Sequence, residues 1–291
     1  MTTVKYLGEG GIELAADIAG EPGNPPVLLL HGGGQTRHSW GTTQRDLAER
    51  GWFVVSLDLR GHGDSAWAPD GDYRLETFGA DVANVARELG RPVLVGASLG
   101  GTSSLIAAAS DGHGGSELAR GLVLVDVAPN IESAGAMRIG RFMRQHVDDG
   151  FGSLDEVADA IQTYNPHRPR PTNLDGLRKN VRQRDDGRWY WHWDPSFIVG
   201  RMGSEDETRA ALAVTHRSSA LEAAARSLTI PTLLVRGMQS DLLSEEGARR
   251  FLELVPHAEL ADVAGAGHMV AGDRNDAFNG AVVTFLERLR D

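Results

Sequence analysis

The chain has 291 residues, of which 41% are hydrophobic and 24% charged, a composition typical of a globular protein with a sizeable buried core. Its net charge of −11 disfavours a nucleic-acid-binding surface, and the absence of cysteine excludes disulfides, thiolate chemistry and cysteine-bound metals. Because the sequence contains neither a secretory signal nor an apolar stretch of about 18 residues, we expect a cytoplasmic protein that does not enter a membrane.

Short apolar runs alternate with longer amphipathic runs through the N-terminal part of the chain. The opening segments 4–7 and 11–20 favour a β-hairpin. The patterns that follow predict strands at 27–30, 52–58, 92–96 and 120–129, and helices at 40–51, 75–90 and 99–110. Strands that are apolar throughout and separated by helices indicate a parallel sheet covered on both faces, and therefore an α/β fold.

The same alternation returns near the C-terminus. It predicts strands at 229–237 and 258–267, and helices at 245–255 and 275–289. Between these two regions, residues 130–215 contain no strand pattern. We therefore expect a helical insertion between two parts of one sheet.

Ser98 lies in the segment Gly-Ala-Ser-Leu-Gly-Gly, where the strand at 92–96 turns into a helix. Such a turn strains the backbone at the serine, and small residues on both sides relieve the crowding. It also places Ser98 at the N-terminus of the helix, where the N–H of Leu99 is free to donate. A serine here could instead cap the helix, but a cap does not need glycine on both sides. We interpret Ser98 as a nucleophile.

A serine hydroxyl needs a general base to attack at neutral pH, and the base needs a carboxylate to orient it. Among the ten histidines, His268 is the strongest candidate, because it follows a predicted strand and shares a sheet edge with Ser98. Asp241 and Asp126 both follow strands and could supply the carboxylate. We prefer Asp241, because it lies one βα unit before the histidine and completes the order Ser…Asp…His, and keep Asp126 as the alternative.

Acyl transfer also needs N–H donors for the developing oxyanion. The His-Gly-Gly-Gly run at 31–34 follows a strand and offers backbone N–H groups that no side chain obstructs. We predict an oxyanion hole formed by Gly33 and Leu99, with Gly34 as the alternative to Gly33. His31 and His62 are interpreted as groups that shape their loops.

The chain resembles the α/β-hydrolase superfamily in five motifs that follow the family's order. They are His-Gly-Gly-Gly at 31–34, Asp-Leu-Arg-Gly-His-Gly-Asp-Ser at 58–65, Gly-Ala-Ser-Leu-Gly-Gly at 96–101, Ser-Asp at 240–241 and Gly-Ala-Gly-His at 265–268. The resemblance implies an eight-stranded, mostly parallel sheet whose second strand is antiparallel. It also implies a helical cap after the sixth strand, here residues 130–215, with residues 1–129 and 216–291 forming the core.

The segment 187–195, Gly-Arg-Trp-Tyr-Trp-His-Trp-Asp-Pro, looks like a cap segment common in this family. Its aromatic side chains either line the substrate pocket or pack the cap. The possible pocket residues are His38, Trp40, Trp191, Trp193 and Met269.

These motifs predict a serine hydrolase that cleaves a carboxylester or lactone of a small molecule through an acyl-enzyme. Because serine stands where the family's epoxide hydrolases and haloalkane dehalogenases carry aspartate, an alkyl-enzyme mechanism is not expected. Three alternatives remain open: hydrolysis of a carbon–carbon bond in a diketone-like substrate, cofactor-free perhydrolysis, and a non-catalytic role as a small-molecule receptor of the same fold.

We expect no metal, no cofactor, and no nucleic-acid or membrane partner. The segment 61–66 matches the pattern Gly-x-Gly-x-x-Ala of dinucleotide-binding loops, but a loop containing Pro69 and Gly71 follows it in place of the required helix. No pattern in the sequence indicates an oligomeric state.

Overall fold

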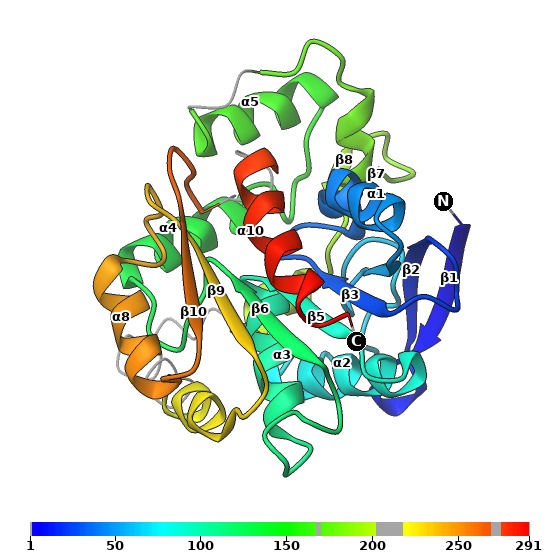
Figure 1. Ribbon diagram of the computed structural model, residues 1–291. Coiled ribbons are helices and arrows are strands. Elements are labelled where there is room, and N and C mark those ends of the chain that lie inside the picture. The colour runs from blue at the N-terminus through cyan, green and yellow to red at the C-terminus, as the bar shows by residue number, and fades with distance from the viewer. Residues whose placement is uncertain (1, 167–169, 202–217, 269–274, 291) are drawn as a thin grey trace.

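In the computed structural model, which describes residues 2–166, 170–201, 218–268 and 275–290, eight strands form one sheet (Figure 1). Their order across the sheet is β1-β2-β4-β3-β5-β6-β9-β10. Strand β2 is antiparallel to β1 and β4, and every other neighbouring pair is parallel. This confirms the expected sheet. The strands are β1 Thr2–Leu7, β2 Glu13–Ala19, β3 Pro26–Leu30, β4 Phe53–Leu57, β5 Val93–Ala97, β6 Gly121–Val125, β9 Thr232–Gly237 and β10 Glu259–Val263.

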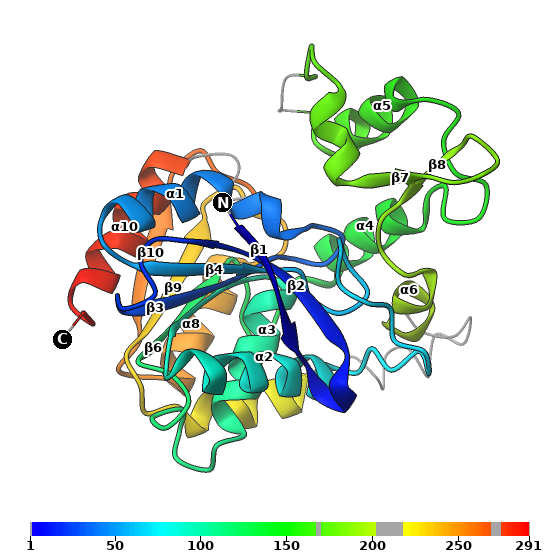
Figure 2. The ribbon, with the colours of Figure 1, turned by 90° about the vertical axis from the view of Figure 1, so that its right-hand side faces the viewer.

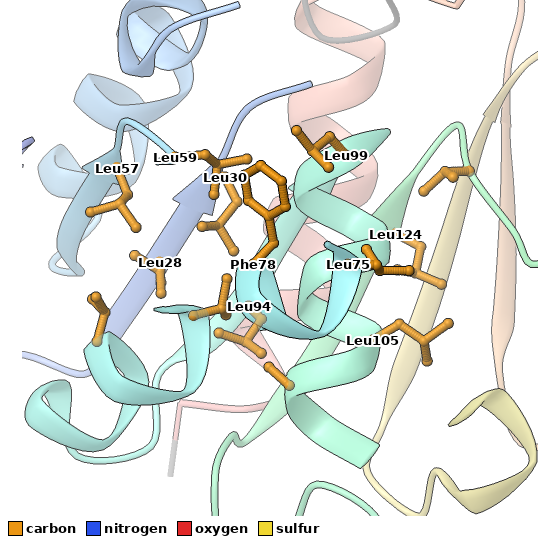
Figure 3. Close-up of a cluster of buried hydrophobic side chains, with 14 of the residues drawn as sticks. Leu28, Leu30, Leu57, Leu59, Leu75, Phe78, Leu94, Leu99, Leu105 and Leu124 are labelled. Atoms are coloured by element: carbon orange, nitrogen blue, oxygen red, sulfur yellow. The ribbon is translucent and has the colours of Figure 1, made fainter. Parts of the chain in front are cut away.

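Helices cover both faces of the sheet because its central strands are apolar on both sides. In β3, Leu28 and Leu30 pack with Phe78 on the face of α2 and α3 (Figure 3), whereas Val27 and Leu29 face α1 and α10. All four strand side chains are fully buried, as expected for a parallel sheet between two helical layers. Among the helices that cover the sheet, α1 Gly41–Glu49 and α10 Asn275–Glu287 lie on one face, and α2 Leu75–Leu89, α3 Leu99–Ala109 and α8 Glu245–Leu254 lie on the other.

Glycines end α1 and α2 where the sequence predicts it. Gly51 follows α1 with a φ of 84°, and Gly90 caps α2 with a φ of 71°. Both angles lie in the left-handed region, which glycine enters without a Cβ penalty. None of the helices in the described ranges is both long and apolar enough to cross a membrane.

The insertion between β6 and β9 is not purely helical. It contains α4 Ser133–Arg144, α5 Leu154–Tyr164, the 3₁₀ turn Asp175–Lys179, β7 Val181–Gln183, β8 Trp189–Trp191 and α6 Pro195–Arg201. Strands β7 and β8 form an antiparallel hairpin, so the prediction of a region without strands is wrong. Each of these strands has only three residues, too few for an alternating pattern to show in the sequence. The predicted end of the insertion at residue 215 lies outside the described residues.

Figure 2 shows the described elements of this insertion gathered to one side of the sheet and its helical layers. We refer to them below as the cap. Its first helix is anchored to the core near β9, where the N–H of Glu132 donates to the carbonyl oxygen of Leu242 at 2.8 Å.

A buried ion pair fixes the loop that follows β4. The Nε and Nη2 atoms of Arg60 each donate to one carboxylate oxygen of Asp81 on α2, both at 2.6 Å. Asp81 also accepts the N–H of Glu9, at 2.7 Å, so the pair joins the β1–β2 turn, the loop and α2. The loop begins at residue 58 and carries His62, which contacts the candidate site described below.

We expect Asp81→Asn to lower the free energy of unfolding by about 3–5 kcal/mol, because it leaves the Arg60 cation buried without a carboxylate. Urea unfolding followed by circular dichroism measures the change. The matched control is Glu49→Gln on the exposed end of α1, which should change stability by less than about 0.5 kcal/mol. Equal losses in the two variants would contradict the role given to the pair.

Candidate active site

Ser98 lies on a strained turn between β5 and α3. Its φ of 46° and ψ of −110° belong to a region that L residues rarely adopt. The turn is possible because glycines allow two close backbone contacts: a Cβ atom at Gly100 would overlap the carbonyl of Leu30, and one at Gly96 would overlap the backbone of Gly100. Throughout α3, all of which the structure describes, no capping hydrogen bond from the Ser98 hydroxyl is present, which disfavours the N-cap interpretation.

His268 pairs with Asp126, not with Asp241. The Nδ1 atom of His268 lies 2.7 Å from Oδ2 of Asp126, whose side chain is fully buried after β6. Asp126 accepts two further hydrogen bonds, from the N–H of Gly237 at 3.0 Å and from the hydroxyl of Ser240 at 2.5 Å. Because these donors stabilise the ionised carboxylate, Asp126 is well suited to orient an imidazole.

The preferred pairing of His268 with Asp241 is therefore wrong in this structure. The side chain of Asp241 is 41% exposed and forms an ion pair with Arg138 of α4, with an Nε–Oδ2 distance of 3.0 Å. The order of acidic residues along the chain could not separate the two candidates, since both follow strands that end at the same sheet edge.

Gly237 explains how His268 reaches across β9 to Asp126. Gly237 is the last residue of β9, and a Cβ atom there would lie 2.7 Å from the carbonyl oxygen of Ala266. The loop that carries His268 therefore packs directly on the end of β9, which lies between β10 and β6. This contact requires glycine, as close backbone approaches generally do.

Sequence reasoning missed Ser240. Its hydroxyl accepts the N–H groups of Leu242 and Leu243, both at 3.1 Å, while it donates to Asp126. The hydroxyl thus holds the carboxylate relative to the loop after β9. Its only sequence signal was its position beside Asp241.

The glycine run at 32–34, which follows His31, lies against Ser98. A Cβ atom at Gly32 would be 3.4 Å from Cβ of Ser98, and one at Gly33 would be 3.9 Å from Cβ of Leu99. The N–H of Gly32 donates to the Gln35 side chain at 3.0 Å, and that of Gly34 donates to a histidine ring. No described residue accepts the N–H of Gly33, so this N–H is the one in the run that is available to a substrate oxygen. Leu99, which carries the other predicted N–H donor, lies beside Gly33 at the start of α3.

His31 and His62 hold this run in place, which confirms their interpretation as loop-shaping groups. His62 Nε2 accepts the N–H of Gly34 at 3.2 Å, and its Nδ1 lies 3.0 Å from the carbonyl oxygen of Arg60. His31 Nε2 accepts the N–H of Leu59 at 3.0 Å, and its Nδ1 lies 2.8 Å from the carbonyl oxygen of Gly32. Each ring needs one N–H donor and one bare nitrogen, so both act as neutral imidazoles.

One cavity of about 450 Å³ joins these groups. Among the predicted site residues, those that line it are Ser98, His268, Gly33, Gly34, Leu99, His38, Trp40, Trp191 and Trp193. Asp126 is not among them, because it lies buried behind the imidazole of His268. The predicted pocket residue Met269 lies outside the described residues. Among the described residues, no cluster of three His, Cys, Asp or Glu side chains is arranged to hold a metal ion.

The cap supplies most of the apolar wall. Trp191 and Trp193 are stacked with ring centroids 4.8 Å apart, and both are buried, so they pack the cap and line the cavity at once. Sequence reasoning missed Met143 of α4, whose Cε would lie 3.0 Å from a Cβ atom at Gly34. It also missed Phe197 of α6, which lies against Gly33. The cap therefore closes directly over the glycine run.

Comparison with known proteins places the chain in a family. Residues 25–274 match the family model described as the alpha/beta hydrolase fold. The chain belongs to this family. Within the α/β hydrolase family it is 31% identical to an esterase of Mycobacterium tuberculosis, over 86% of this chain and 78% of that protein.

Two further relatives extend this comparison. The chain is 25% identical to the 2-hydroxy-6-oxo-6-(2'-aminophenyl)hexa-2,4-dienoic acid hydrolase of Metapseudomonas resinovorans, over 99% of this chain and 92% of that protein. The crystal structure of E-2-(acetamidomethylene)succinate hydrolase superposes with a TM-score of 0.80 at 24% identity, covering 98% of this chain and 100% of that one. This superposition shows that the two proteins share a fold.

The buried imidazole of His31 predicts a loss of stability in acid. Burial is the main reason that the pKa of His31 falls to about 4, from 6.5 in an exposed ring. Below about pH 6.5 His31 therefore binds a proton in the unfolded chain but not in the folded protein. The free energy of unfolding falls by up to about 3 kcal/mol towards pH 4. Above pH 6.5 this contribution is fully present.

Urea unfolding across this pH range, in the wild type and in His31→Asn, measures the contribution. We expect a shallower pH dependence in the variant, whatever its stability at neutral pH. The control is His113→Asn, which removes an exposed histidine and should leave the slope unchanged. Parallel slopes for the wild type and His31→Asn would contradict the prediction.

Proposed function

We propose that this protein is a serine hydrolase that cleaves carboxylesters or lactones of small molecules, with Ser98 as nucleophile, His268 as general base and Asp126 as the orienting carboxylate. One observation carries the proposal. A serine on a strained strand-to-helix turn shares a cavity with a histidine whose Nδ1 is bound to a buried carboxylate. This is the arrangement by which proteins convert a weak hydroxyl nucleophile into a reactive one.

In the proposed mechanism, His268 takes the proton of Ser98 as the hydroxyl attacks the substrate carbonyl. The N–H groups of Gly33 and Leu99 donate to the oxyanion that forms, a contribution of about 3 kcal/mol for each donor. His268 then protonates the leaving alcohol, and water repeats the sequence to release the acid. Asp126 keeps the Nδ1–H of the ring in place and stabilises the imidazolium in each step.

The cavity and the relatives support a small-molecule substrate. A volume of about 450 Å³ falls in the range of pockets that enclose drug-sized ligands. The relative from Mycobacterium tuberculosis is an esterase, which favours ester cleavage as the first candidate reaction. The similarity to the dienoic acid hydrolase favours carbon–carbon bond hydrolysis as the second. Vinylogous diketones offered beside an ester panel distinguish the two reactions.

Removal of the nucleophile tests the proposal directly. We expect Ser98→Ala to lower p-nitrophenyl ester turnover by more than about 10³-fold and to abolish labelling by a fluorophosphonate probe. The wild type should label at one serine, identified by peptide mass spectrometry. Unchanged turnover in Ser98→Ala would remove Ser98 as the nucleophile, and an unreactive wild type would favour a binding role.

The two acidic candidates form a matched pair of variants. We expect Asp126→Asn to lower kcat by about 10⁴-fold, because an amide cannot hold the imidazole in the required tautomer. Asp241→Asn, which breaks only an exposed ion pair, should stay within about twofold of the wild type. Steady-state kinetics with near-ultraviolet circular dichroism as a folding control measures both. The reverse pattern would move the acid to Asp241.

A further inference from the structure

The charge inside the cavity is opposite to that of the whole protein. The chain carries a net charge of −11, yet no Asp or Glu is found among the described residues that line the cavity. Among these described lining residues, the one Lys or Arg is Lys179, at the end of the 3₁₀ turn in the cap. Opposite charges in a partly enclosed cavity attract, so this lining favours an anionic group in an otherwise acidic protein.

Lys179 differs from its cationic neighbours because its charge is not neutralised. A smaller adjoining cavity is lined by Lys179 together with Arg37, Arg178 and Arg182. Each arginine has a carboxylate partner: Arg37 contacts Asp17, Asp58 and Asp64, Arg178 contacts Asp175, and Arg182 contacts Asp64. Across the described ranges, no carboxylate lies within ion-pair distance of Lys179, which leaves its ammonium group available to a ligand.

Neutral hydrogen-bonding groups accompany Lys179 in the cavity lining. Asn180 follows it directly, and Asn165 follows α5. Both are half-buried, and the part of the chain that the structure describes provides no side-chain hydrogen-bond partner for either carboxamide. Burial and the nearby charges of Arg37 and Lys179 lower the pKa of His38, so its ring offers a further neutral polar group. A carboxamide donates N–H groups, which are suitable partners for a carboxylate oxygen.

The remainder of the cavity is mainly apolar, and it connects this polar region of the cap to Ser98 in the core. Trp193 of the cap and the glycines at 32–34 line this cavity, and Thr36 and His38 line both it and the adjoining cavity, as Lys179 does. A substrate that reaches both regions therefore presents its reactive carbonyl to Ser98 and its other end to Lys179.

We propose that the substrate carries a carboxylate on its non-reacting end, separated from the scissile carbonyl by an apolar segment, and that Lys179 with Asn180 and Asn165 binds this carboxylate. The inference rests on the proposed hydrolase function and adds the substrate class. A single ammonium group matches the single negative charge of a carboxylate, and amide donors complete its hydrogen bonding. Lys179 is thus a specificity-determining residue that takes no part in proton transfer.

Matched pairs of esters test the inference. Each pair consists of the p-nitrophenyl monoester of a linear dicarboxylic acid, from succinic to suberic, and the same ester with its free carboxylate capped as a methyl ester. For at least one chain length, we expect the wild type to hydrolyse the free carboxylate with a kcat/KM about tenfold higher than its capped partner. We expect Lys179→Met to remove this preference through a higher KM, with the capped ester unaffected.

The matched control is Arg178→Met. Arg178 precedes Lys179 and carries the same charge, but its side chain lines only the smaller cavity and not the main one. This control should leave the preference in place, so a general electrostatic effect would be recognised by equal losses in the two variants. Higher salt should weaken the preference in the wild type, since screening reduces a contact with an exposed lysine. A wild type that favours the capped ester at every length, or a Lys179→Met variant that loses both activities equally, would overturn the inference.

A binding experiment separates this inference from the proposed reaction. Ser98→Ala cannot form an acyl-enzyme, and the cavity contains Trp40, Trp191 and Trp193, whose fluorescence reports occupancy. Titration with the monomethyl and dimethyl esters of the same dicarboxylic acids, from succinic to suberic, should show tighter binding of the monomethyl ester for at least one chain length, and Lys179→Met in the same background should remove the difference. This result would uphold the carboxylate site even if the wild type cleaved no ester. Equal binding of the monomethyl and dimethyl esters at every chain length would overturn it even in an active esterase.

Discussion

The close contact of α3 with the ends of β3 and β5 is the constraint on which the candidate site depends. Glycines at 96, 100 and 101 bring the helix so near that a Cβ atom at any of them would collide with backbone or with Val127. Ser98 is held at a positive φ between them, a strain of about 1–3 kcal/mol that the surrounding burial has to offset. The same contact lets the N–H of Gly100 donate to the carbonyl oxygen of His31 at 3.0 Å, which couples the turn at Ser98 to the glycine run.

Two neutral histidines connect the glycine run beside this contact to the rest of the core. His31 and His62 join the glycine run to the loop at 58–65, and the buried pair of Arg60 and Asp81 ties that loop to α2. Met143 and Trp193 of the cap press on Gly34 from the other side. The N–H of Gly33 is thus oriented by contacts on both sides of the run, which suits the oxyanion-donor role that we propose for it.

In the function that we propose, the cap and not the core gives the site its selectivity. In that proposal the core presents the nucleophile, the base and the N–H donors, which suit any carbonyl substrate. The cap adds stacked tryptophans and Lys179, to which no described residue offers a carboxylate, so the two parts of the cavity differ in polarity. Because fold alone does not determine a protein's substrate, we assign the selectivity to the side chains of the inserted segment.

Sequence alone determined the α/β sheet, because buried strands read as continuous apolar runs, and it located Ser98, His268 and the glycine run at strand ends. It did not resolve the hairpin in the cap, whose strands have three residues each. Only the tertiary structure decided between Asp126 and Asp241. That choice depends on the spatial order of β5, β6, β9 and β10, and on a close approach at Gly237 between segments about thirty residues apart. The sequence shows which strand precedes each acidic residue, whereas packing at the sheet edge determines which of these residues contacts His268.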